Sequence, residues 1–268
     1  MSALVILGDS AATGVGDQVT DGIYRGWGHY LFQALIGFNE YHNISRPGAR
    51  VRELADVQIP LALEIKPKVA ILIIGGNDVL RNDFNPKQMY DYLSDSILKL
   101  KEIDCEVFAM NLHDPAKILP IPRILKRILR RRVSAVNNMF VALEQDYGLQ
   151  VLNISNIDEV YDLKLWHVDR MHPNKLGHQK LATHFASLLR MRGYNSNPIF
   201  VGELEQRSRL TGLLWMIKNG TPWFLKRSID LLPVILLLTF LEFFGLTEKL
   251  IPTSTFAPSE ETTFQLIA

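Results

Sequence analysis

Apolar runs of strand length alternate with stretches of helical period through residues 1–192, and this alternation constrains the fold more than any other feature. The runs lie at residues 3–7, 40–45, 69–74, 105–110 and 149–154, of which 40–45 is the weakest. Continuous apolar runs are typical of strands buried on both faces, and alternation with helices predicts a parallel sheet. We predict a three-layer, doubly wound α/β fold with helices on both faces and five strands in the flavodoxin-like order 2-1-3-4-5.

Helices are predicted between and after these strands, and the strongest amphipathic patterns cover residues 26–37, 86–102, 123–146 and 174–191. Beyond residue 192 the alternation stops. Residues 193–251 are predicted to form a helical, partly apolar extension of the domain. Residues 252–268 are rich in Ser, Thr, Pro and Glu, a composition typical of disordered tails.

Composition narrows the class of protein. With 268 residues and a formal net charge of +1, the chain fits one domain plus an extension, and no overall basic excess indicates nucleic-acid binding. The single cysteine, Cys105, lies in an apolar stretch and is predicted to be a small buried side chain. The first strand begins almost at Met1, which leaves no room for a signal peptide, so we expect a cytoplasmic location.

Three of the predicted strands are followed by loops that carry reactive or glycine-rich segments. These are Gly8-Asp9-Ser10, Ser45-Arg46-Pro47-Gly48 and Gly75-Gly76-Asn77-Asp78, after the first, second and third strands. In the predicted order these loops are neighbours at the carboxyl edge of the sheet, where ligands bind. The Ser10 hydroxyl would be a nucleophile there. The backbone N–H groups of Ser10 and Gly48 and the side-chain amide of Asn77 would form an oxyanion hole.

A serine nucleophile needs a base, and the base needs a group that fixes its tautomer. Asp169 and His172 are three residues apart, as on one turn of a helix, so the carboxylate can reach one ring nitrogen while the other faces Ser10. His167 stands two residues before Asp169, a spacing at which helical side chains do not meet, and ranks below His172. His178 and His184 fall on the last predicted helix and are expected to be surface or packing residues.

These four segments together resemble the SGNH hydrolases, the GDSL-like esterase and lipase superfamily, over residues 1–192. The resemblance implies Ser10 as nucleophile, Asp169 and His172 as its triad partners, and Ser10, Gly48 and Asn77 as oxyanion donors. Ala11 stands where the first block usually has leucine, a position outside those roles. Two further stretches, Arg25-Gly26-Trp27 and Asn174-Lys175-Leu176-Gly177-His178, resemble a branch common in actinobacteria and described as lysophospholipase-like esterases.

The expected reaction is hydrolysis of a small acyl ester through an acyl-enzyme, with no cofactor. Two other readings stay open: an acyltransferase on the same triad, and a binding or scaffold module of the same fold. A metal-dependent phosphoesterase using Asp9, Asp78, Asp169 and His172 is disfavoured by the spacing of these residues. No metal is therefore expected, and Thr13-Gly14-Val15-Gly16 lacks the third glycine of a dinucleotide fingerprint.

Three features outside the triad also have functional readings. His113 follows the fourth predicted strand and either lines the substrate pocket or has a plain loop role. Residues 117–132 carry seven Lys or Arg and no acid, interleaved with Ile and Leu. This segment is either a solvated helix face or a surface for anionic head groups or membranes. The apolar stretch 231–246 is interrupted by Glu242 and is expected to contact a membrane surface, a second subunit or the hydrolase domain.

Overall fold

A computed structural model of the chain describes residues 2–20, 23–202, 240 and 244. Its main sheet has five parallel strands in the order β4-β1-β5-β6-β7, which confirms the predicted flavodoxin-like order. Strand β1 stands near the middle, where the winding direction reverses. The bounds are β1 (Ala3–Gly8), β4 (Glu40–Asn43), β5 (Val69–Ile73), β6 (Glu106–Met110) and β7 (Gln150–Leu152).

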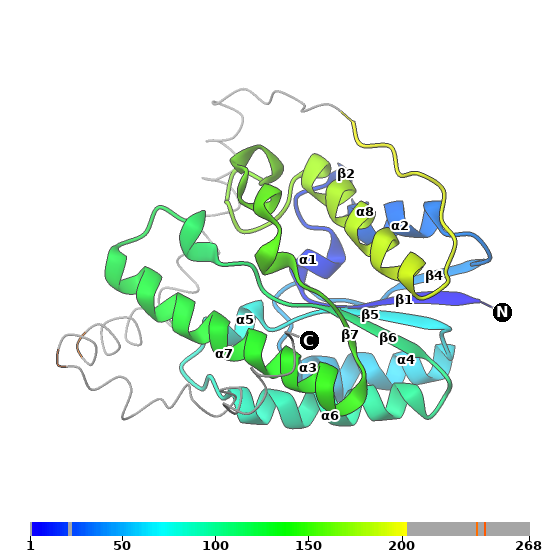
Figure 1. The fold of residues 1–268 in the computed structure, drawn as a ribbon, viewed down its shortest axis with the longest axis horizontal. Coiled ribbons are helices and arrows are strands. Elements are labelled where there is room, and N and C mark those ends of the chain that lie inside the picture. Colours follow the sequence, from blue (N-terminus) through cyan, green and yellow to red (C-terminus); the bar gives the residue numbers. More distant parts are fainter. Residues whose placement is uncertain (1, 21–22, 203–239, 241–243, 245–268) are drawn as a thin grey trace, which may run out of the picture.

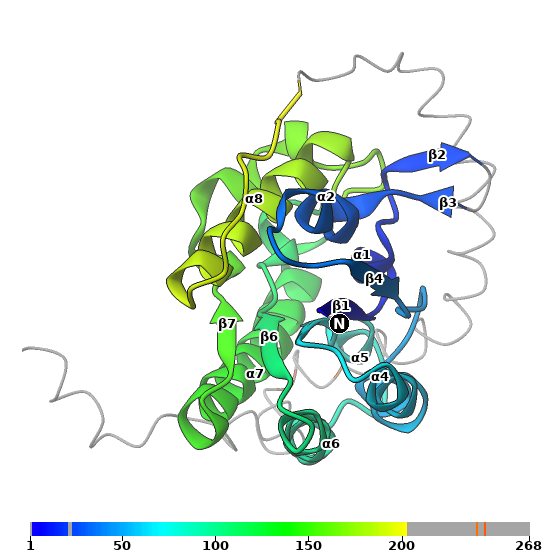
Figure 2. The same cartoon turned by 90° about the vertical axis from the view of Figure 1, so that its right-hand side faces the viewer.

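Helices cover both faces of this sheet (Figures 1 and 2). The long helices on one face are α2 (Gly26–Ala34) and α8 (Lys175–Met191), and those on the other are α4 (Ile59–Ile65), α6 (Pro86–Lys101) and α7 (Arg123–Tyr147). Short helices α1 (Ser10–Thr13), α3 (Val51–Glu53) and α5 (Gly76–Val79) follow strand ends, and a π-helical turn, Leu54–Gln58, joins α3 to α4. Single 3-10 turns occupy Pro115–Lys117, Ile154–Asn156, Asp158–Tyr161 and Leu163–Leu165.

Strand β1 shows why a continuous apolar run belongs at the centre of such a sheet. Its side chains alternate between the two faces, so Leu4 and Ile6 pack with α2 and α8, while Val5 and Leu7 pack with α4, α6 and α7. All four are fully buried. Trp27 of α2 stacks on Phe185 of α8, with ring centroids 4.6 Å apart, within the core between the sheet and these two helices.

The predicted elements differ from the observed ones mainly at their ends. The helix predicted over 26–37 stops at Ala34, because Leu35 turns extended and pairs with Ser196. Strands β2 (Gln18–Thr20) and β3 (Ile23–Tyr24) form a small antiparallel ribbon that was not predicted (Figure 2). Cys105 is buried, as predicted.

The predicted C-terminal extension is described only at its beginning. Within residues 193–202, the backbone of Asn195 accepts a hydrogen bond from Ile36 and that of Asn197 donates to Ala34, so this stretch runs along the end of α2 and is not helical. The predicted disordered tail and, except for residues 240 and 244, the apolar stretch 231–246 lie outside the described residues. Within the described part of the chain, no helix has the length and apolar character needed to cross a bilayer.

Candidate active site

Ser10 is the first residue of α1, directly past the carboxyl end of β1. The preceding Gly8 has φ +136°, and a Cβ there would lie 1.8 Å from the carbonyl oxygen of Ile73, so only glycine lets the two backbones approach this closely. Asp9 then caps α1, because its side chain accepts a hydrogen bond from the Ala11 N–H at 3.0 Å. This local geometry fixes the Ser10 hydroxyl at the carboxyl edge of the sheet.

His172 and Asp169 reach Ser10 from a segment 162 residues further along the chain. His172 Nε2 lies 2.8 Å from Ser10 Oγ, and His172 Nδ1 lies 2.9 Å from Asp169 Oδ2. A carboxylate only accepts hydrogen bonds, so Nδ1 carries the proton in the neutral ring and Nε2 is left as the acceptor for the serine hydroxyl. Nucleophilic catalysis by a serine requires a hydroxyl, an imidazole and a carboxylate linked in this way.

The prediction that these two residues share a helical turn is wrong, although their contact is present. Residues 169–172 form a tight turn in which Arg170 has φ +54°. Asp169 Oδ1 accepts hydrogen bonds from the backbone N–H groups of Met171 at 2.8 Å and His172 at 3.1 Å. The aspartate therefore builds the turn with one oxygen and orients the imidazole with the other.

His167 belongs to the same cluster, contrary to the spacing argument that ranked it low. Its Nδ1 lies 3.4 Å from Asp169 Oδ2, and its backbone N–H donates to the carbonyl of His172 at 2.8 Å. Burial alone would raise the pKa of Asp169, but hydrogen bonds from His167 and His172 outweigh it and hold that pKa well below its usual range. Asp169 is thus kept as an anion beside the His172 ring.

Asn77 lies on α5, after β5, and faces the same edge of the sheet. Its Nδ2 donates to the carbonyl oxygen of Ala49 at 3.1 Å and lies 3.4 Å from Asp9 Oδ2. Gly48, with φ +84°, stands directly before Ala49 in the turn after β4. The three loops predicted to be neighbours are therefore in contact, while the donor role of Gly48 stays a prediction.

The acids weighed as metal ligands have other partners. Asp78 accepts hydrogen bonds from the Arg50 side chain at 3.2 Å and the Val51 N–H at 3.1 Å, so it ties α5 to α3. Asp9 is buried next to Ser10 in the chain, and this burial raises its pKa to about 6. Residues 2–20 and 23–202 contain no group of three or more His, Cys, Asp or Glu arranged to hold a metal ion.

A cavity of about 170 Å³ opens beside Ser10. Its polar lining consists of Asp9, Ser10, Asn77, His113, Arg170 and His172, and the rest is mostly hydrophobic. The structure places His113 in this wall and also against the Trp166 ring, with centroids 4.6 Å apart. Burial lowers the pKa of His113 to about 4, so its ring is neutral at physiological pH. The two histidines of α8 have other contacts: His178 is buried against the Val15 carbonyl, and His184 pairs with Glu159.

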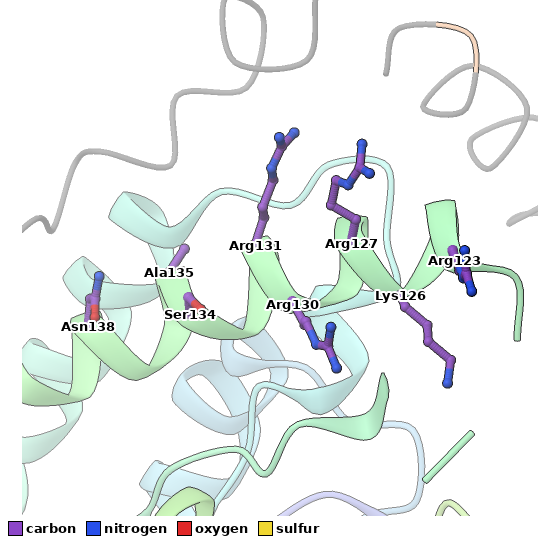
Figure 3. Close-up of a pocket in the computed structure, with 8 residues that line it drawn as sticks. All are labelled: Arg123, Lys126, Arg127, Arg130, Arg131, Ser134, Ala135 and Asn138. Carbon is purple, nitrogen blue, oxygen red and sulfur yellow. The ribbon is translucent and has the colours of Figure 1, made fainter. Parts of the chain in front are cut away.

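The basic segment 117–132 is split between a 3-10 turn and the first part of α7. A hollow on α7 is lined by Arg123, Lys126, Arg127, Arg130, Arg131, Ser134, Ala135 and Asn138, and Figure 3 shows the cationic side chains leaving the helix on different sides. Arg130 pairs with Asp114 at 2.8 Å. Arg132 is not part of this surface: it is buried and donates to the carbonyls of Val79 and Arg81.

Comparison with known proteins identifies the family. The GDSL-like lipase/acylhydrolase family profile matches residues 6–180, well over half of the chain. No curated protein sequence matches.

Solved structures share the fold at low identity. The psychrotrophic esterase EstA from a Pseudoalteromonas species is 19% identical with a TM-score of 0.55, covering 72% of this chain and 98% of its own. A catalytic mutant of an acetylxylan esterase from Geobacillus stearothermophilus is 18% identical with a TM-score of 0.55, covering 70% and 94%. The chain therefore belongs to the GDSL-like lipase/acylhydrolase family and is a carboxylic ester hydrolase.

Proposed function

We propose that this chain hydrolyses carboxylic esters through a covalent acyl-enzyme formed on Ser10. The observation that carries the proposal is the unbroken hydrogen-bond chain from Ser10 Oγ to His172 Nε2, at 2.8 Å, and from His172 Nδ1 to Asp169 Oδ2, at 2.9 Å. His172 and Asp169 are both largely buried, with side chains 18% and 15% exposed, so water competes little for these contacts.

The steps follow from the geometry. His172 Nε2 takes the proton of the Ser10 hydroxyl while Ser10 Oγ attacks the ester carbonyl. The tetrahedral intermediate collapses, His172 returns the proton to the departing alcohol, and the acyl group stays on Ser10. Water then loses a proton to His172 and attacks the acyl carbonyl. The acid leaves and the Ser10 hydroxyl is restored. Asp169 holds the ring in the tautomer that each step requires.

Negative charge on the ester oxygen needs donors in both tetrahedral intermediates. Asn77 Nδ2 carries two hydrogens: one bonds the Ala49 carbonyl at 3.1 Å, and the other makes a long contact with Asp9 Oδ2 at 3.4 Å, which the oxyanion would replace. We assign the remaining donors to the backbone N–H groups of Ser10 and Gly48. Removal of one donor of this kind lowers kcat roughly 10²–10³-fold, so we expect Asn77→Ala to have that effect.

Hydrolysis of p-nitrophenyl butyrate tests the proposal. Ser10→Ala and His172→Ala are each expected to lower kcat roughly 10⁴–10⁶-fold. His184→Ala, on α8 and paired with Glu159, serves as the matched control and should retain wild-type activity. A Ser10→Ala enzyme within tenfold of wild type would contradict the proposal. Wild-type protein that binds esters without cleaving them would instead support the scaffold reading, and ester formation with an added alcohol would support the acyltransferase reading.

A further inference from the structure

The cavity beside Ser10 is hydrophobic away from the triad. Its lining includes Ser10, Asn77 and His172, and most of the other lining side chains are aliphatic and come from three separate segments. These include Val79 and Leu80 after β5, Leu112 and Leu119 after β6, and Leu129 and Val133 of α7. Aliphatic side chains cannot form hydrogen bonds with a sugar or a charged alcohol, but they can pack against a hydrocarbon chain.

The polar groups in the wall do not change this character. His113 is neutral, because burial lowers its pKa to about 4. Asp9 is buried next to Ser10 in the chain and accepts the hydrogen bond of the Ala11 N–H. Arg170 donates to the carbonyl of Ile118 at 3.4 Å, which links the triad turn to the segment between β6 and α7.

We propose that this cavity binds the acyl chain of the substrate and that Leu129 of α7 limits the chain length. This proposal rests on the proposed acyl-enzyme on Ser10. A water molecule takes up ~30 Å³ in the liquid and a methylene group is of similar size, so the cavity of 170 Å³ holds an acyl chain of roughly six carbons. The alcohol has to leave and water has to enter, so the solvent-facing side of Ser10 is left for the alcohol.

Burial of hydrocarbon gives a quantitative expectation. Each methylene moved from water into an apolar site contributes ~0.8 kcal/mol, which is about fourfold in rate. For p-nitrophenyl esters, kcat/KM should therefore rise about fourfold per carbon, or ~250-fold over the four carbons from acetate to hexanoate, and then level off or fall for longer chains. Varying the alcohol of an acetate ester should change kcat/KM much less than lengthening the acyl chain does.

Variants at Leu129 test the assignment. Leu129→Trp fills the cavity and is expected to lower the ratio of kcat/KM for hexanoate to kcat/KM for acetate more than tenfold. Leu129→Ala enlarges the cavity and should move the optimum to longer chains by one or two carbons. Val141→Trp, an exposed position on the same helix, is the control and should leave the chain-length profile unchanged.

The outcomes separate this proposal from the proposed function. Wild-type activity that is equal on acetate and hexanoate, or an unchanged profile in both Leu129 variants, would overturn the acyl-chain assignment while the acyl-enzyme stands. A rise in kcat/KM with alcohol length, in place of acyl length, would overturn it as well. Wild-type protein without activity on any ester, acetate included, would contradict the proposed function and this proposal with it.

Discussion

At the scale of single residues, Asp169 contacts several groups of the site at once. One of its oxygens accepts two backbone N–H groups and so fixes the turn, and the other faces His172 at 2.9 Å and His167 at 3.4 Å. A carboxylate has enough lone pairs for all of these contacts. Its orientation therefore depends on His167 as well as on the base that it serves.

Replacement of His167 tests this dependence. We expect His167→Ala to lower kcat/KM on p-nitrophenyl butyrate about tenfold, because a hydrogen bond to a charged group contributes ~1.5–3 kcal/mol and this one is long. His167→Gln, whose amide also donates, should restore most of the rate. An alanine variant with wild-type kcat/KM would show that the orientation of Asp169 does not depend on His167.

The residues of the site differ in how well the sequence predicts them. Ser10 and Asn77 could be predicted because each follows an apolar strand whose carboxyl end faces the crevice. The His167 contact was missed because a rule for helical spacing was applied to a tight turn, and a left-handed residue such as Arg170 has no sequence signal. One signal was available, since aspartate side chains often accept the N–H two residues on, as Asp169 does from Met171.

At the scale of elements, the side chains of α7 fall into three groups with different surroundings. Val136, Met139 and Phe140 pack into the core, Leu129 and Val133 line the cavity, and the cations of its first turns line the hollow of Figure 3. The helix begins at Arg123 as predicted, because Pro120 and Pro122 cannot continue a helix from Lys117. Whether the cationic surface binds anionic lipids stays a prediction.

Vesicle binding tests that prediction. We expect Arg123→Gln combined with Lys126→Gln to weaken binding to phosphatidylserine vesicles tenfold or more at low salt, because each cation near an anionic surface contributes ~1 kcal/mol. The matched control is Lys87→Gln combined with Lys99→Gln on α6, which removes the same charge elsewhere. Hydrolysis of p-nitrophenyl acetate should stay unchanged in both. Equal binding by the two double variants would mean that this surface is not a lipid site.

At the scale of the whole molecule, the strand order brings the loops after β4, β1 and β5 together at one edge. This arrangement could be predicted from the spacing of five apolar runs and the chirality of parallel connections. The ribbon of β2 and β3 could not be predicted from the sequence, because its two short strands are largely exposed and show no apolar pattern. The end of α2 was also unpredictable, since it depends on the pairing of Leu35 with Ser196, far along the chain.

Burial of Asp9 also links the site to the stability of the whole fold. Its pKa is raised to about 6 in the folded protein, from 3.8, so between these values the folded state holds a proton that the unfolded state has lost. The free energy of unfolding contributed by this group therefore falls as pH rises through that window.

Asp9→Asn cannot ionise and should lack this decrease. The difference between its free energy of unfolding and that of wild type should therefore shift in favour of the variant by ~2–3 kcal/mol from about pH 4 to pH 7, since each pKa unit corresponds to ~1.4 kcal/mol. Urea unfolding of both proteins at the two pH values measures the change. A difference between variant and wild type that is the same at both pH values would contradict the assigned ionisation of Asp9.

Covalent labelling tests the central claim, that Ser10 is the nucleophile, most directly. An alkyl fluorophosphonate reacts with an activated serine and leaves an adduct that water does not readily remove. Mass spectrometry of the treated protein is expected to show one adduct, on the peptide that contains Ser10, with esterase activity falling in proportion and no adduct in Ser10→Ala or His172→Ala. An adduct on a different residue that abolishes activity, or full activity with Ser10 labelled, would contradict it.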